Sequence, residues 1–250
     1  ANLQDHLQLR SVYKVSRVTT LNTLANSLWG KARIGLEYAL KRSGPMSMAP
    51  SQLGAFTRSD PAQPWPNIEY HVQPLSLEAF GEPLHSFPAI TASVCNLNPT
   101  SRGTVHIRSA RFGDAPAIAP NYLATQADQR VAVDSLRLTR RIAAQPALAP
   151  FAPQEYKPGT QFQTDDELVR LAGDIATTIF HPVGTTAMGR DGDAMAALDS
   201  HLRVRDGRGG LIAGLRVVDA GAMPTITSGN TNSPTLMMAE KAARWMLRGD

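Results

Sequence analysis

The sequence predicts an α+β fold, and two features of its residue order carry that prediction. Stretches that alternate apolar and polar residues, as half-buried strands do, lie before about residue 110. Helical patterns with capping signals dominate after that point. Strands and helices segregated in this way are typical of α+β proteins rather than of alternating α/β proteins.

The predicted strands have a two-residue period or form a short run bounded by turn residues. They cover residues 7–13, 68–72 and 104–108, a short stretch near residues 55–56, and a stretch within 87–97. Loops rich in Ser, Gly and Pro separate several of them, as expected for turns on the surface.

Three helices are predicted by apolar residues at helical spacing, and they cover residues 21–42, 126–144 and 165–179. The first ends at Gly44 and Pro45, a pair that stops a helix. Thr164 is the expected N-cap of the third, and three acidic residues in its first turn suit the helix dipole.

The composition narrows the class of protein. With 42% hydrophobic and 18% charged residues among 250, the chain can bury a core and is not expected to be disordered. The single cysteine excludes a disulfide scaffold, and no apolar run reaches the ~18–20 residues of a membrane span. The net charge of +4 comes without a basic block, so we expect no nucleic-acid partner.

No charged and apolar leader opens the sequence, and we expect a cytoplasmic protein. Residues 1–6 resemble the middle of a protein, so we expect the chain to be one piece of a longer one. Basic residues on the first helix are expected to be a solvated face, with weak contact to a membrane surface as the alternative. They are Lys31, Arg33, Lys41 and Arg42.

Several motifs that carry chemistry do not occur in the sequence. It contains no G-x-G-x-x-G, no G-x-x-x-x-G-K-[ST], no G-x-S-x-G and no C-x-x-C. The six histidines show no metal-binding spacing such as H-E-x-x-H. The sequence therefore predicts no metal site.

His181 begins a stretch of small and turn-forming residues after the third predicted helix. Pro182 disfavours helical geometry at His181, and the small residues that follow allow the backbone to approach another group closely. The functional interpretation is a histidine directed at a ligand. The more ordinary interpretation, which spacing alone favours, is a histidine that caps the helix end.

Residues 219–235 form a long polar loop between a predicted buried strand, 215–219, and a last helix over 233–248. Ser233 is the expected N-cap of that helix, Pro234 its first residue, and Gly249 ends it. A strand end, a loop and a helix N-terminus together often bind a ligand, because the helix offers free N–H groups. The alternative is an ordinary surface turn.

Four segments resemble the C-terminal region of the GMC (glucose–methanol–choline) oxidoreductases, and in particular the bacterial choline and alcohol dehydrogenase branch. They are residues 181–185, 215–220, 223–232 and 234–243. Residues 2–6 resemble the segment that follows the family's second signature. Family members carry the G-x-G-x-x-G motif in a preceding half, which explains why this sequence does not show it.

The resemblance implies two interleaved domains. A substrate domain, with an antiparallel sheet flanked by helices, would span residues 18–163. Residues 1–17 would be the edge of an FAD-binding domain, and 164–250 its C-terminal part. The implied cofactor is FAD, and the implied partners are a small-molecule alcohol and the missing N-terminal half.

The implied reaction oxidises an alcohol to a carbonyl by hydride transfer to flavin. His181 is the implied base, because an alcohol releases hydride easily only when its hydroxyl proton also leaves. Asn230 is the implied donor to the substrate oxygen. The implied cofactor-binding residues are Asp219, Ala220, Asn230, Thr231, Asn232, Ser233 and Pro234, of which the last three would face the pyrimidine edge of the flavin.

Two other functions remain open at this point. Some hydroxynitrile lyases share the family's fold and bind FAD without net redox chemistry, and bleaching of the flavin by an alcohol would separate the two classes. The chain could also be a non-catalytic fragment, since it lacks the nucleotide-binding motif.

Overall fold

A computed structural model describes residues 1–49 and 51–249, and the chain in it forms two compact units. The sheet unit comprises Gln8–Asn96 and Arg130–Thr177, and the site unit comprises Ala1–Leu7, Leu97–Gln129 and Thr178–Asp250. The boundaries of these two units differ from those of the expected domains, which were the consecutive ranges 1–17, 18–163 and 164–250. Leu97–Gln129 joins the site unit, where the backbone of Gly103 forms two hydrogen bonds with Leu3, of 3.0 and 2.8 Å.

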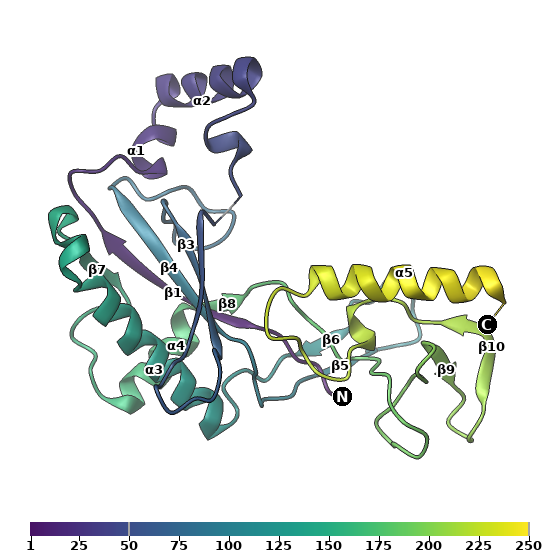
Figure 1. Cartoon of the computed structure of the whole chain (residues 1–250). Helices are drawn as coiled ribbons and strands as arrows, with labels where there is room; N and C mark the ends of the chain where they lie inside the picture. Colours follow the sequence, from purple (N-terminus) through teal and green to yellow (C-terminus); the bar gives the residue numbers. More distant parts are fainter. Residues whose placement is uncertain (50, 250) are drawn as a thin grey trace. The chain divides into compact units, whose positions relative to one another are not determined.

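An antiparallel sheet forms the centre of the sheet unit (Figure 1). Its strands are β1 (Leu7–Lys14), β2 (Leu53–Thr57), β3 (Ile68–Gln73), β4 (Ala89–Asn96) and β7 (Gln154–Lys157), in the order β2-β3-β4-β1-β7, with β8 (Ala176–Thr178) also paired to β1. The strands predicted in the first half of this unit are therefore confirmed. Their alternating pattern places one set of side chains on each face.

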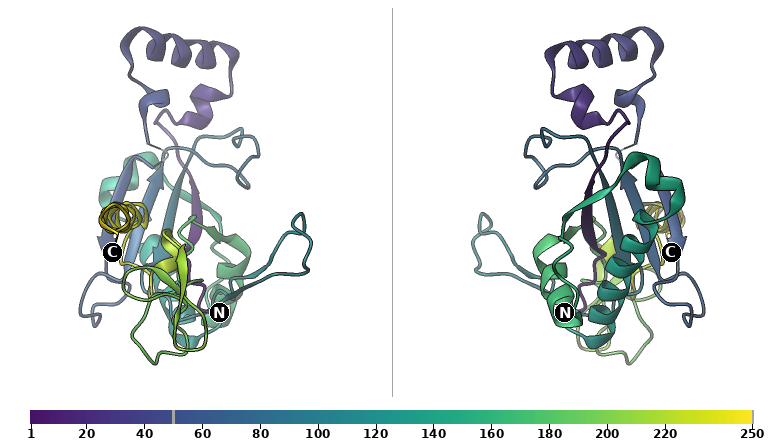
Figure 2. Two further views of the ribbon diagram at one scale, coloured as in Figure 1. Left: turned by 90° about the vertical axis from the view of Figure 1, so that its right-hand side faces the viewer. Right: turned by 90° about the vertical axis from the view of Figure 1, so that its left-hand side faces the viewer.

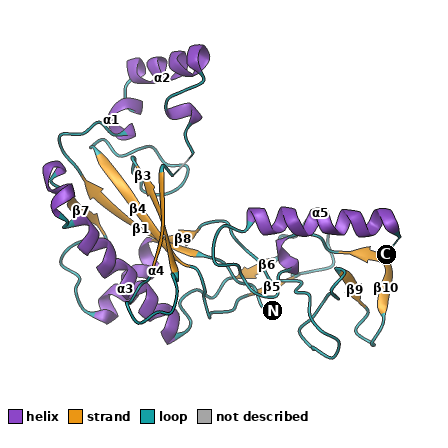
Figure 3. Cartoon of the chain, viewed as in Figure 1, coloured by secondary structure: helices purple, strands orange, loops and turns teal. Residues whose placement is uncertain are grey.

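One face of this sheet packs against α3 (Gln126–Ala143). The Tyr70 hydroxyl lies 2.8 Å from Thr139 Oγ1 on that helix, and burial raises the pKa of this tyrosine. Leu136 of α3 and Leu168 of α4 (Asp165–Ile175) are fully buried, and η2 (Pro146–Phe151) follows α3. Both helices lie beside the same side of the sheet in Figure 3.

The predicted start of α4 is confirmed, and its predicted end is wrong. Thr164 accepts a hydrogen bond from Glu167 N–H, while the Glu167 side chain accepts from Thr164 N–H, which is a capping box. The helix ends at Ile175 and not at residue 179, because Ala176 takes an extended conformation and begins β8, the partner of β1.

The prediction of a single helix over 21–42 is wrong. The structure has two helices there, α1 (Leu21–Ala25) and α2 (Leu28–Lys41), followed by η1 (Pro45–Ser47). The break falls at Ser27, whose side chain accepts a hydrogen bond from Gly30 N–H and starts a new helix. No residue of α2 is buried, and α2 projects beyond the end of the sheet in both views of Figure 2. Among the described residues, no helix has the length and apolar character needed to cross a bilayer.

The site unit contains more loop than regular structure. Its elements are β5 (Thr104–His106), β6 (Ala117–Ala119), β9 (Arg203–Arg205), β10 (Leu211–Arg216), η3 (Ala220–Ala222) and α5 (Asn232–Arg248). α5 contributes Met238 to a buried cluster with Val183, Met223 and Ile226. One turn further along, its Ala242 packs against Leu198 and two other buried residues, so loops and helix share a core.

Two sequence predictions fail here. The buried strand over 215–219 is instead the end of β10, an exposed strand that pairs with β9 and stops at Arg216. A short apolar run cannot by itself distinguish a buried strand from an exposed hairpin. The N-cap of α5 is Thr231 rather than Ser233, so Ser233 and Pro234 lie inside the first turn, while Gly249 ends the helix as predicted.

Candidate active site

The segment formed by Gln4, Asp5 and His6 is polar and buried, and it organises the site. These side chains are only 3%, 7% and 0% exposed. Gln4 exchanges two backbone hydrogen bonds with Val183, of 3.0 and 2.8 Å, and its Oε1 accepts a third from Ile226 N–H at 3.2 Å. Gln4 therefore holds the backbone at two positions, Val183 and Ile226, which lie far apart in the sequence.

Asp5 holds the backbone at His181. Its Oδ1 accepts a hydrogen bond from His181 N–H at 2.9 Å, and its Oδ2 accepts from the hydroxyls of Tyr122 and Thr178. Burial and the neighbouring Asp5 carboxylate raise the pKa of Tyr122, so its phenol stays protonated and keeps donating. Phe180, directly before His181, has a φ of +65°, a conformation that a bulky residue rarely adopts unless its surroundings impose it.

The rings of His181 and His6 meet edge to face. Their Nδ1 atoms are 3.0 Å apart, and the ring planes make an angle of 81°. His6 Nε2 lies 3.0 Å from the carbonyl oxygen of Leu97. His181 is 9% exposed, which makes it the more accessible of the two.

These contacts determine which ring nitrogens carry protons. A carbonyl oxygen only accepts, so His6 Nε2 must donate to Leu97. In neutral His6 the Nδ1 atom is then an acceptor, and His181 Nδ1 must donate to it. A neutral His181 consequently has its lone pair on Nε2, which is the state a general base requires.

Asn230 lies next to that lone pair. Its Nδ2 atom is 3.4 Å from His181 Nε2, and the Asn230 residue as a whole is exposed. The structure thus brings together the two residues expected to be catalytic, which are 49 positions apart. The helix-cap interpretation of His181 is wrong, because α4 ends at Ile175 and the ring contacts His6 and Asn230 instead.

The start of α5 offers donors that suit an anionic or carbonyl edge of a cofactor. Thr231 makes no side-chain cap, and Asn232 and Ser233 are exposed residues of the first helical turn, whose N–H groups have no partner within the helix. Pro234 has no N–H, and the helical ladder begins with Thr235 N–H, which donates to Thr231 O at 3.1 Å.

The second group of predicted cofactor residues lies at η3. The Asp219 side chain accepts a hydrogen bond from Gly221 N–H at 2.7 Å, which caps the turn that contains Ala220. A Cβ atom at Gly221 would come within 2.8 Å of the Thr185 and Thr186 hydroxyls. Thr186 Oγ1 is buried without a hydrogen-bond partner. The exposed helix start and this orphaned hydroxyl are compatible with a bound polar cofactor such as FAD.

Sequence reasoning missed Asp5 and His6 as parts of the site. Residues 2–6 resemble a family segment, but the sequence alone does not pair His6 with His181, because the two are 175 positions apart and show no periodic relation. The available signal was local: two ionisable residues stand directly before the apolar strand pattern at 7–13.

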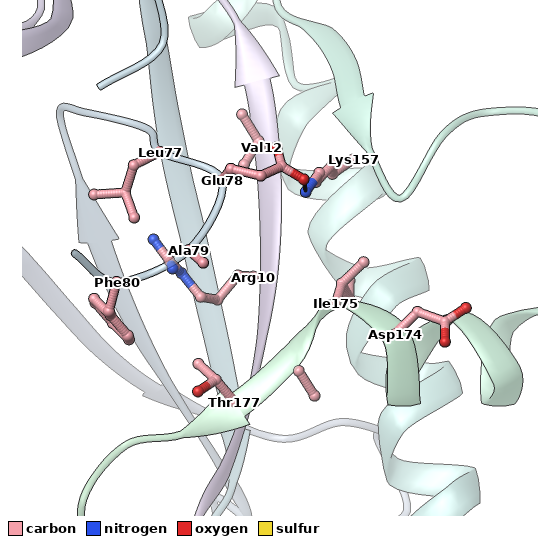
Figure 4. A pocket seen from close by; sticks show the side chains of 11 residues that line it. Arg10, Val12, Leu77, Glu78, Ala79, Phe80, Lys157, Asp174, Ile175 and Thr177 are labelled. Atoms are coloured by element: carbon pink, nitrogen blue, oxygen red, sulfur yellow. Dashed lines mark hydrogen bonds and ion pairs between the residues drawn. The ribbon is translucent and has the colours of Figure 1, made fainter. Parts of the chain in front are cut away.

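The sheet unit has its own cavity, of about 230 Å³ (Figure 4). Arg10 and Phe80 line it, and the guanidinium lies 4.5 Å from the centre of the phenyl ring. Burial lowers the pKa of Arg10, and one terminal nitrogen of its guanidinium is buried without a hydrogen-bond partner. None of the residues predicted from the sequence to be catalytic or cofactor-binding lines this cavity.

Comparison with known proteins defines the class to which this fold and site belong. A family model described as GMC oxidoreductase matches residues 99–239, more than half of the chain. The chain belongs to the GMC oxidoreductase family.

Curated relatives resemble the chain over nearly all of its length. The oxygen-dependent choline dehydrogenase of Vibrio vulnificus is 39% identical over 246 residues, which is 98% of this chain and 43% of the relative. The enzyme of the same name from Stenotrophomonas maltophilia is 36% identical over 97% of this chain and 42% of its own length. The chain thus spans less than half of these relatives.

Solved structures share the fold. Pyridoxine 4-oxidase from Mesorbium loti has a TM-score of 0.76 and 28% identity, covering 97% of this chain and 42% of that protein. A formate oxidase has a TM-score of 0.85 with 22% identity, over 97% of this chain and 46% of the oxidase. An FAD-dependent oxidoreductase from Chaetomium thermophilum has a TM-score of 0.82 with 21% identity, over 99% and 48%.

Proposed function

We propose that this chain supplies the C-terminal part of an FAD-dependent enzyme that oxidises a primary alcohol, choline or a similar one, to a carbonyl compound. The single observation that carries the proposal is the contact of His181 with both His6 and Asn230. It leaves one lone pair, on His181 Nε2, beside an amide donor in a partly accessible position.

His181 acts as the base in this proposal. Its Nε2 takes the hydroxyl proton of the alcohol, and both nitrogens of the ring then carry protons. His6 Nδ1 continues to accept from His181 Nδ1–H, at a distance of 3.0 Å, and so stabilises the imidazolium. His6 is thus a positioning residue. It sets the tautomer of His181 before the reaction and stabilises the positive charge of the His181 imidazolium after it.

The Asn230 amide donates to the substrate oxygen as negative charge develops there. Its distance of 3.4 Å from His181 Nε2 is long for a hydrogen bond, so the amide can turn to an oxygen placed between the two groups. The tautomer of His181 and the position of this donor favour removal of a hydroxyl proton, as the proposed oxidation requires.

FAD supplies the hydride acceptor when it is bound. The N–H groups of Asn232 and Ser233, with the partial positive charge of the α5 N-terminus, would hold the pyrimidine edge, together with Asn230, Thr231 and Pro234. Asp219 and Ala220 would hold the ribityl–pyrophosphate portion, next to the Thr186 hydroxyl.

The partner of this chain, in this proposal, is the nucleotide-binding half that family relatives carry in one polypeptide. This chain covers only 42–43% of the length of the choline dehydrogenases, which supports the existence of such a partner. So does the outward face of α5, where Leu236, Met237 and Leu247 are 61%, 59% and 88% exposed. Apolar side chains gathered on one face of a helix favour a protein partner.

Anaerobic addition of choline to the complete flavoprotein tests the function. We expect the flavin absorbance to bleach, because the alcohol reduces it. A flavin that stays oxidised with choline and with a series of other primary alcohols would contradict the proposal, and cleavage of a cyanohydrin without bleaching would assign the lyase instead. The chain alone is expected to bind FAD weakly, since it lacks the glycine-rich turn for the pyrophosphate.

A further inference from the structure

The cavity of about 230 Å³ in the sheet unit contains a buried cation that the proposed oxidation does not use (Figure 4). The cation is Arg10 of β1, which is 7% exposed. One terminal nitrogen of its guanidinium is buried and makes no hydrogen bond. Burial of a charged group is unfavourable unless another group pairs with it. An unsatisfied guanidinium that lines a cavity therefore points to a ligand in that cavity.

The two acidic residues that line the cavity do not neutralise Arg10. The Glu78 carboxylate accepts a hydrogen bond from Lys157 Nζ and lies 3.3 Å from His85 Nε2. These two contacts, that of Lys157 first, lower the pKa of Glu78, so its carboxylate is ionised and already paired. Asp174 is an exposed residue of α4, and its carboxylate points away from Arg10 in Figure 4. The positive charge of Arg10 is thus left for a ligand.

The neighbours of Arg10 orient its guanidinium and leave its edge available. The guanidinium carbon lies over the Phe80 ring, 4.5 Å from the ring centre, which is a cation–π contact. Ser93, the residue paired with Arg10 on β4, is small and neutral. A guanidinium stacked on a ring still presents N–H groups at its edge, and these can bind a carboxylate through two parallel hydrogen bonds.

We propose that the Arg10 cavity binds the carboxylate group of a small aliphatic monocarboxylate. One guanidinium matches one negative charge, whereas a phosphate ester carries close to two charges and needs more donors. The lining also includes Val12, Leu77 and Ile175, which suit a short hydrocarbon chain. The Thr177 hydroxyl is a further polar group of the lining.

Two sources supply this chemistry. One is a hydroxy acid that is itself the oxidised alcohol, and the other is a separate monocarboxylate that is not oxidised. The guanidinium forms the same charge-assisted hydrogen bonds with both. The first source rests on the proposed function, whereas binding of the second is measured without any turnover.

Calorimetric titration of the complete flavoprotein with butyrate tests the site, and butyramide is the uncharged probe of similar shape. We expect one butyrate per chain, bound at least ~10-fold more tightly than butyramide, because hydrogen bonds between charged groups are the stronger ones. Arg10→Met should abolish this preference. Arg10→Lys should retain part of it, since lysine keeps the charge but has no planar fork.

Arg170→Met is the matched control, because Arg170 is an exposed arginine of α4 in the same unit, and butyrate affinity should stay unchanged in it. Equal affinity for butyrate in Arg10→Met and the wild type, or no preference for butyrate over butyramide in the wild type, would overturn the proposal. If the Arg10 variants fail to fold, a crystal structure of the wild-type enzyme with butyrate decides. A carboxylate within hydrogen-bond distance of Arg10 is expected, and water alone in the cavity overturns the proposal.

Flavin reduction by 4-hydroxybutyrate and by 1-butanol distinguishes the two sources. If the substrate supplies the carboxylate, Arg10→Met should lower kcat/KM at least ~10-fold for 4-hydroxybutyrate and leave that for 1-butanol unchanged. If a separate molecule supplies it, the substitution should affect both alcohols equally while butyrate binding is still lost. A flavin that neither alcohol reduces would count against the proposed function, and the butyrate titration would still decide the binding site.

Discussion

The two units of the molecule are stabilised by different kinds of interaction. The sheet unit has paired strands and a core in which Ile68, Leu136 and Leu168 are at most 1% exposed. The site unit depends on side chains that bind backbone groups far away in sequence, as Gln4 does with Ile226 and Asp5 with His181. Substitutions in the core of the sheet unit should therefore mainly lower the free energy of unfolding. Substitutions of the proposed catalytic residues in the site unit should mainly lower the rate of flavin reduction.

The largest effect is expected for His181→Ala in the complete enzyme. Loss of a general base lowers a rate by roughly 10²–10⁴-fold, and we expect this reduction in the rate of flavin reduction by substrate. Bound FAD should remain, because the side chain is not proposed to hold it. Stopped-flow absorbance measures the rate, and His106→Ala, at the exposed end of β5 in the same unit, should behave as the wild type. A rate within a few-fold of the wild type would remove His181 from catalysis.

Leu136→Ala tests the other unit. This α3 residue is 1% exposed, and truncation of such a leucine costs about 2–5 kcal/mol because it leaves a cavity. Urea denaturation should show that loss of unfolding free energy, while Leu211→Ala, at an exposed position of β10, should change it by less than about 0.5 kcal/mol. Equal losses in the two variants would contradict the assigned core.

Asn230→Ala should slow flavin reduction by about 10–10³-fold, as expected when one donor to a developing oxyanion is removed. Because Asn230 is exposed, stability should hardly change. The same stopped-flow assay, with thermal unfolding as a second readout, separates the two effects. An unchanged rate would show that the amide does not reach the substrate.

Asp199 provides a smaller, pH-dependent comparison within the site unit. Burial alone would raise its pKa, but hydrogen bonds from the Arg203 side chain and from the N–H groups of Arg203 and His201 outweigh burial, and the pKa is lowered. A carboxyl whose pKa is lower in the folded state stabilises the fold above its unfolded pKa of about 3.9, and that stabilisation is lost as the pH falls through the folded pKa.

Asp199→Asn should therefore reduce the unfolding free energy at pH 7, by about 1–2 kcal/mol. The difference from the wild type should shrink as the pH is lowered from 7 to 3, because the stabilisation by the carboxylate begins to be lost below the unfolded pKa of about 3.9. Urea denaturation at the two pH values measures both. A difference that grows on acidification would show the opposite sign of linkage.

The difference between the two units also explains which elements could be predicted from the sequence. Strands such as β3 and β4 follow from alternation, because one face of each is buried locally. The capping box at Thr164 also follows from neighbouring residues. The helix break at Ser27 and the exposure of β10 could not be predicted in this way, since each depends on packing against residues outside a short stretch of sequence.

The site was predictable only in part for a related reason. His181 and Asn230 were assigned by resemblance, and the structure places them in contact. His6 was not assigned, because its role depends on meeting His181 and the Leu97 carbonyl in three dimensions. The assignment of the units to substrate and FAD domains stays a prediction.

In the proposed mechanism His6 leaves the lone pair of His181 on Nε2, and nitrogen-15 NMR of the histidine rings can measure where the protons lie. At neutral pH we predict a protonated Nδ1 and an unprotonated Nε2 in His181, with the reverse in His6. His181→Gln and His6→Gln assign the two sets of signals. A His181 ring protonated at Nε2 would contradict the account, because such a ring has no lone pair for the substrate proton.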